Sequence, residues 1–107
     1  MIVRFAFLLL FCLSAVAALA GDEPLRLVLH EHKFTPEQFD VPAHVKFRLL
    51  VKNDSDADIE WESDELDREE VISPGEERTI YLGPLDPGSY PFYDDRHSAS
   101  KGVLIAK

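Results

Sequence analysis

Short stretches that mix hydrophobic and polar residues in alternation recur along this chain from residue 25 to the end. Clusters of Pro, Gly and Asp separate them, and each stretch is short, so the pattern predicts β-strands. About seven such strands at this spacing are typical of an all-β Greek-key sandwich. The predicted strands are LRLVLHEH (25–32), QFDVP (38–42), VKFRLLVKN (45–53), IEWES (59–63), ERTIYLG (77–83), SYPFY (89–93) and KGVLIAK (101–107).

Two further segments bear on this interpretation. The acidic stretch DELDREEV (64–71) is expected to be a loop or one short helical turn. In GPLDPGSYPF (83–92) a Pro-Gly turn precedes Tyr90, which predicts a tyrosine corner, in which the hydroxyl bonds back to upstream backbone. The alternative is that Tyr90 is a half-buried aromatic residue without this role.

The first twenty residues, MIVRFAFLLLFCLSAVAALA, carry one charge, Arg4, followed by a long apolar run, and end in small residues, as a cleaved secretory signal peptide does. A transmembrane anchor is the alternative, but the apolar run is short for a bilayer and finishes in alanines. We therefore expect a signal peptide at 1–20 and one domain at 21–107, in the periplasm. Cys12 would leave with the signal, so no disulfide is expected.

Charge narrows the range of partners. After removal of Arg4 with the signal, ten basic residues face twenty acidic ones, a net charge of −10. This balance argues against nucleic acid and anionic lipid, and it favours cations or basic protein surfaces. We expect no direct membrane insertion of the mature domain.

Strand lengths predict which loops share an end of the sandwich. The nine residues 45–53 span about 30 Å as a strand, so the PAH turn with His44 and the corner at Pro87 belong to one pole. The segments 32–36, 54–60 and 94–100 then meet at the opposite pole. His44 is accordingly a poor candidate for that cluster.

Several motifs give the chain a family resemblance across residues 25–107. They are FTPEQFDVPA (34–43), VKFRLLVKN (45–53), SPG (73–75), LDPGSYPF (85–92) and KGVLI (101–105). On these motifs the chain resembles the cupredoxins. IEWES together with FYDDRHSASKG (92–102) resembles more narrowly the cupredoxin-like domains of bacterial periplasmic iron-uptake systems, the EfeO type and its FtrB-like relatives.

The resemblance implies positions for four metal ligands. Glu60 stands where blue-copper proteins have their first His, Asp94 where they have Cys, and Ser100 where they have the axial Met; His97 alone retains its residue type. A blue-copper site needs a thiolate, so blue-copper electron transfer is excluded. Oxygen ligands with one imidazole suit Fe, Mn, Zn or Cu(II) better than Cu(I).

Neighbouring residues could complete this site. Glu62 shares a strand face with Glu60, because side chains alternate along a strand. If Trp61 belongs to the core, however, both glutamates could be ordinary solvent-exposed charges. Asp95 would take the place of Asp94 as the ligand if the alignment to the family shifts by one residue.

The histidines and the aspartate turn are open to simpler interpretations too. His30 and His32 are expected on one strand face, and His32 lies near the predicted site. Both could instead be exposed residues of an edge strand. The turn YDDRH could be an Asp-rich turn with an internal pair to Arg96.

The sequence contains no classical catalytic constellation. The leading hypothesis is a periplasmic metal-binding protein that carries Cu(II) or Fe and assists ferrous or ferric iron uptake by binding or oxidising iron. Its expected partners are an inner-membrane iron permease and other periplasmic iron-uptake proteins. The alternative is a metal-free sandwich that docks through its acidic pole onto a permease or another partner protein.

Overall fold

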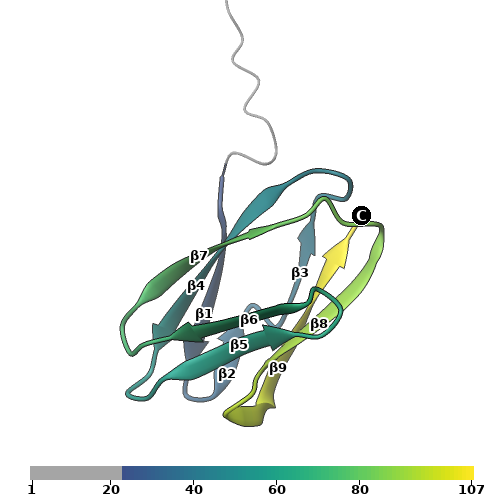
Figure 1. Ribbon diagram of the computed structural model, residues 1–107. Coiled ribbons are helices and arrows are strands. Elements are labelled where there is room, and N and C mark those ends of the chain that lie inside the picture. The colour runs from purple at the N-terminus through teal and green to yellow at the C-terminus, as the bar shows by residue number, and fades with distance from the viewer. Residues whose placement is uncertain (1–22) are drawn as a thin grey trace, which may run out of the picture.

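A computed structural model describes residues 23–107, which form a sandwich of two β-sheets (Figure 1). The predicted signal peptide at 1–20, its Cys12 and the predicted domain start at Gly21 lie outside the described residues. Within residues 23–107 we find no helix with the length and apolar character needed to cross a membrane.

The two sheets contain nine strands. One sheet has the order β2-β1-β4-β7 and the other the order β3-β9-β8-β5-β6. β1 runs parallel to β4 and β3 parallel to β9, whereas all other pairs are antiparallel. The all-β sandwich prediction is confirmed, with nine strands rather than about seven. The strands are β1 Leu25–His30, β2 Lys33–Thr35, β3 Gln38–Val41, β4 Phe47–Asp54, β5 Ile59–Ser63, β6 Arg68–Ile72, β7 Glu77–Leu82, β8 Gly88–Asp94 and β9 His97–Ala106.

The core lies between the sheets and follows from strand alternation. On β5 every second residue is buried, and Trp61 is fully buried. Phe92 stacks on Trp61 with ring centroids 5.7 Å apart and meets Phe34 edge-on at 5.1 Å. Gly102 on β9 lets the Phe92 ring approach the backbone, because a Cβ atom there would lie 2.5 Å from a ring carbon. The aromatic core therefore fixes how β5, β8 and β9 pack.

The acidic stretch 64–71 corrects one prediction. Residues Arg68–Ile72 form strand β6 at the edge of the five-stranded sheet, rather than a loop or helical turn. Glu70, which is opposite the buried Trp61 of β5, points inward at the middle of β6. Its carboxylate pairs with Arg68 at 3.2 Å and with Arg78 of β7 at 3.0 Å. A charged residue paired with arginines of its own strand and of β7 thus occupies an inward position where alternation favours an apolar residue.

Two strand boundaries also differ from prediction. β1 ends at His30, and the expected continuation to His32 is replaced by a two-residue turn into β2. β9 begins at His97, so most of the expected loop 94–100 is strand and only Asp95 and Arg96 form the turn.

The far pole is arranged as predicted. The Tyr90 hydroxyl donates a hydrogen bond to the carbonyl of Asp86 at 2.7 Å, which confirms the tyrosine corner. The His44 amide donates to the Leu85 carbonyl at 2.8 Å, so the PAH turn lies against this corner. His44 is therefore remote from the other pole.

Candidate functional site

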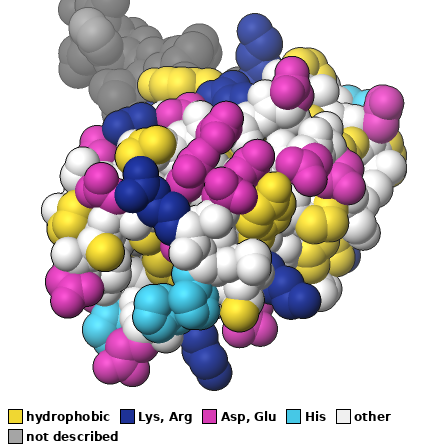
Figure 2. Space-filling view, turned by 60° about the horizontal axis from the view of Figure 1, so that its bottom comes forward, with side chains coloured by type: hydrophobic (Ala, Val, Ile, Leu, Met, Phe, Trp, Pro, Cys, Tyr) yellow, Lys and Arg dark blue, Asp and Glu magenta, His cyan; other side chains and the backbone are white. Residues whose placement is uncertain are grey.

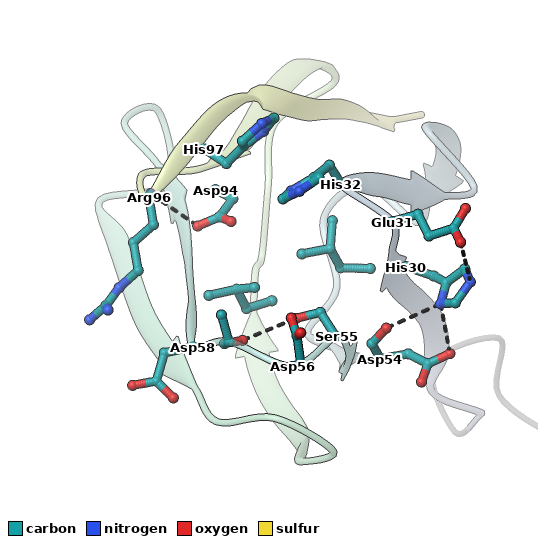
Figure 3. Close-up of a pocket in the computed structure, with 13 residues that line it drawn as sticks. His30, Glu31, His32, Asp54, Ser55, Asp56, Asp58, Asp94, Arg96 and His97 are labelled. Atoms are coloured by element: carbon teal, nitrogen blue, oxygen red, sulfur yellow. Dashed lines mark hydrogen bonds and ion pairs between the residues drawn. The ribbon is translucent and has the colours of Figure 1, made fainter.

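A pocket of about 470 Å³ opens at the pole opposite His44 (Figure 3). Three segments line it: the β1–β2 turn, the β4–β5 loop at 54–58 and the β8–β9 turn. These are the segments whose meeting the strand lengths predicted. His32, Asp94 and His97 lie along one side of the pocket, and Ser55, Asp56 and Asp58 lie along the opposite side.

Asp94 is the buried acidic residue of this pocket, with 3% of its surface exposed. It pairs with Trp61 across β8 and β5, and paired residues in an antiparallel sheet point to the same face, so its carboxylate points inward. Its Oδ1 accepts hydrogen bonds from the amides of Glu60 at 2.9 Å and Arg96 at 3.1 Å. Asp94 thereby ties the β8–β9 turn to β5.

His32 and His97 meet at the rim of this pocket. Their rings stack with centroids 4.0 Å apart and an angle of 19° between their planes. His32 sits in the turn after β1, where Glu31 and His32 have φ angles of 49° and 62°. Such left-handed conformations cost about 1–2 kcal/mol per residue for side chains other than Gly, and turns of this kind prefer Asn-Gly. Strained backbone is often found at functional sites.

Ser100 fixes the hydrogen bonding of His97. Its hydroxyl donates to the His32 carbonyl at 2.6 Å and lies 3.1 Å from His97 Nδ1. A serine hydroxyl has one hydrogen, so His97 Nδ1 must be the donor in the second bond. The proton therefore sits on Nδ1, which leaves Nε2 of neutral His97 with its lone pair free for a metal ion.

His30 does not share a face with His32, contrary to the prediction. Its Nδ1 lies 3.2 Å from the Asp54 carboxylate and 3.1 Å from the Asp54 carbonyl. The turn at Glu31 and His32 reverses the chain before His32, so the two-residue period of a strand no longer applies.

Glu60, Glu62 and Asp95 form a second group, on the outer face of the five-stranded sheet. One carboxylate oxygen from each lies within 4.8 Å of the others, and no other group of three His, Cys, Asp or Glu residues within 23–107 converges in this way. Trp61 faces the core, so its neighbours on β5 must face outward. Glu60 and Asp94 thus lie on opposite faces of one sheet, and the structure does not bring them together as side chains.

The outer group is electrostatically crowded. A hydrogen bond with Glu69, followed by reduced hydration and the charge of Glu69, raises the pKa of Glu60 above its ordinary value. Reduced hydration, with the charges of Asp95 and Asp64, raises the pKa of Glu62. Figure 2 shows acidic side chains spread over one face of the molecule and a cluster of histidine side chains near one end.

The six predicted ligands therefore separate into two places. Asp94, His97 and His32 lie at the pole pocket, whereas Glu60, Glu62 and Asp95 lie on the outer sheet face.

The structure adds two residues that sequence reasoning did not connect with His97 or the pocket loop. One is Ser100 as a hydrogen-bond partner of His97. The other is Asn53, whose buried Nδ2 donates to the carbonyls of Ala57 at 2.8 Å and Ile72 at 2.9 Å and so shapes the loop that lines the pocket. The sequence signal for Asn53 was its place as a polar residue at the end of the apolar strand VKFRLLVKN.

Comparison with known proteins identifies the family of this chain and one relative. The profile of the cupredoxin-like domain family matches residues 3–106. An uncharacterized protein of Rickettsia prowazekii (strain Madrid E), RP394, is 37% identical over 82 residues, which cover 76% of this chain and 66% of that protein. The chain thus matches slightly less than two thirds of that relative.

Solved structures share the fold at low sequence identity. Reduced auracyanin from Roseiflexus castenholzii is 17% identical with a TM-score of 0.65, over 78% of this chain and 96% of that one. The metal-binding domain of the Cu(I)-exporting ATPase CopA of Streptococcus pneumoniae D39, solved with Cu(I), is also 17% identical, with a TM-score of 0.69 over 78% of this chain and 84% of that one. At this identity the likeness shows the fold alone.

Proposed function

This chain belongs to the cupredoxin-like domain family, and from that premise we propose that it is a periplasmic metal-binding protein that assists iron uptake. The observation that carries the proposal is the meeting of His32 and His97 at the pole pocket, with Nε2 of His97 left free by its bond to Ser100. Iron is the cargo in this proposal, and an inner-membrane iron permease of an EfeO-type or FtrB-like system is the proposed recipient.

A blue-copper centre does not fit these residues. Such a centre needs a thiolate, and residues 23–107 contain neither Cys nor Met. At the positions that the family resemblance assigns to Cys and Met, Asp94 Oδ1 binds two amides and the Ser100 hydroxyl binds the His32 carbonyl. We therefore assign no copper-thiolate chemistry to the chain.

An iron ion or Cu(II) fits the available donors better. His97 Nε2, a ring nitrogen of His32 and Asp94 Oδ2 would hold it, and nitrogen with carboxylate oxygen suits these ions. Both imidazoles are on exposed residues, so a metal ion can reach them from solvent. Asp94 lies beneath them in the same pocket but does not converge with them within 4.8 Å, so the two histidines are the main ligands in this proposal. Acidic residues around the opening favour the approach of cations, among them Glu31, Asp54, Asp56 and Asp58.

Metal titration of the purified, chelator-treated protein tests the proposal. We expect one site for Fe(II), under anaerobic conditions, or for Fe(III), Mn(II), Cu(II) or Zn(II), and we expect His97→Ala and His32→Ala to weaken it at least tenfold. His44→Ala is the matched control, because His44 lies at the far pole.

Two outcomes would overturn this assignment. Binding that is lost in Glu62→Gln and kept in His97→Ala would move the metal to the outer carboxylates. If no metal binds tightly, the metal-free docking module becomes the better explanation of the acidic pole.

A further inference from the structure

The pole pocket has an apolar floor that a metal site does not need. Leu29 of β1 and Ile59 of β5, core residues that are each 2% exposed, line it, so the pocket ends against the core between the two sheets. At about 470 Å³ it is also far larger than a bare ion, since one water molecule occupies about 30 Å³ in the liquid. An organic group would use both the floor and the volume.

The same pocket contains one buried charge with an open side. Asp94 uses Oδ1 for its two amide bonds, and Oδ2 forms no hydrogen bond with any described residue. Oδ2 is not fully enclosed by protein atoms. Because Asp94 lines the pocket, this oxygen is open to it. A buried carboxylate oxygen strongly favours a cationic donor over water alone.

From these two features we propose that the pole pocket binds an alkylammonium group. The ammonium would lie at Asp94 Oδ2, and its aliphatic stem would pack over Leu29 and Ile59. A primary amine supplies three donors on a short apolar chain, which matches a carboxylate above an apolar floor.

The charges around the opening favour this ligand class over an anionic one. Four carboxylates surround the pocket in addition to Asp94, on Glu31, Asp54, Asp56 and Asp58, against one arginine, Arg96. An anionic or neutral molecule of the same shape would lose this attraction. The ammonium could come from a free diamine or from a lysine side chain of a partner protein, and the chemistry at Asp94 would be the same.

A ligand series measured by NMR shift perturbation on the chelator-treated full chain tests whether the aliphatic stem packs on the apolar floor of the pocket. We expect n-alkylammonium ions from methyl to pentyl to shift pocket resonances, with affinity rising roughly fourfold for each methylene that becomes buried. Butanoate and butanol are the matched controls and should not bind there. Equal binding of butanol, or affinity that does not depend on chain length, would overturn the proposal.

Asp94→Asn tests the charge with little change of shape, because the amide oxygen can still accept the bonds from Glu60 and Arg96. We expect at least a tenfold loss of pentylammonium affinity; an unchanged affinity in a folded variant would also overturn the proposal. His97→Ala should keep amine binding while losing metal, so failure of either proposal is seen separately. Cadaverine and Nα-acetyl-lysine amide distinguish the sources: tighter binding of the lysine derivative indicates a partner side chain, and tighter binding of cadaverine a free diamine.

Discussion

Replacement of Ser100 by Ala should weaken metal binding without touching a metal ligand. The hydroxyl accepts a hydrogen bond from His97 Nδ1 and donates one to the His32 backbone carbonyl, so it orients the His97 imidazole and ties it to the turn that carries His32. Loss of a hydrogen-bond partner behind a ligating histidine typically reduces metal affinity about 10–100-fold. At about 1.4 kcal/mol per tenfold change, this corresponds to about 1.4–2.8 kcal/mol of binding free energy.

The same substitution should also lower stability, because Ser100 is buried, with 1% of its surface exposed. It leaves the His32 carbonyl without this donor, which costs about 1–3 kcal/mol where the carbonyl stays buried. Urea denaturation measures this loss, and binding should then be measured under conditions where the variant is fully folded.

The assay combines metal titration by calorimetry with ¹⁵N NMR of the histidine rings in metal-free protein. In the wild type we expect the proton of His97 on Nδ1, and in Ser100→Ala a mixture of both tautomers. Ser98→Ala, at an exposed position of the same strand, is the matched control and should change neither. A folded Ser100→Ala variant that keeps the Nδ1 tautomer and loses less than threefold in affinity would refute this reasoning.

Three further predictions concern stability. The pKa values of Glu60 and Glu62 are raised in the fold, so their contribution to stability is complete below the ordinary value of 4.5 and is lost as pH rises through the raised values. Glu62→Gln should therefore melt at a higher temperature than wild type at pH 7, with a gain that shrinks toward pH 4; a gain independent of pH would contradict this. Asn53→Ala removes the Nδ2 donor of the buried bond to the Ile72 carbonyl and should lower the unfolding free energy by about 1–3 kcal/mol, measured with urea. Tyr90→Phe removes the corner hydrogen bond and should cost about 1 kcal/mol, whereas Tyr81→Phe, at a 66% exposed residue, should be neutral; equal costs would argue against the corner.

Much of the fold could be read from local patterns in the sequence. Alternation places Leu27 and Leu29, or Leu49 and Val51, on one face of a strand, and this pattern depends only on the two-residue period of extended chain. The Pro-Gly turn before Tyr90 predicted its corner for a similarly local reason. Strand length alone was enough to separate His44 from the pole pocket.

The candidate site was less predictable because it depends on which face each residue takes. Position relative to the family motifs put Glu60 and Asp94 in one ligand set, yet burial of Trp61 turns Glu60 outward while the pairing of Asp94 with Trp61 turns Asp94 inward. The apolar Ile59 and Trp61 already indicated an outward Glu60, but the alignment to the family motifs compares positions along the chain and does not record which face of the sheet a residue takes.

By itself, then, the sequence determined an all-β sandwich and the meeting of three segments at one pole, because strand period and strand length are local properties. The tertiary structure alone decided that His32 meets His97 through Ser100, and that Glu70 can occupy an inward position of β6. Both depend on partners distant in the chain: Ser100 is 68 residues from His32, and Arg78 comes to Glu70 from the other sheet. Only packing of the two sheets brings these groups within hydrogen-bond distance.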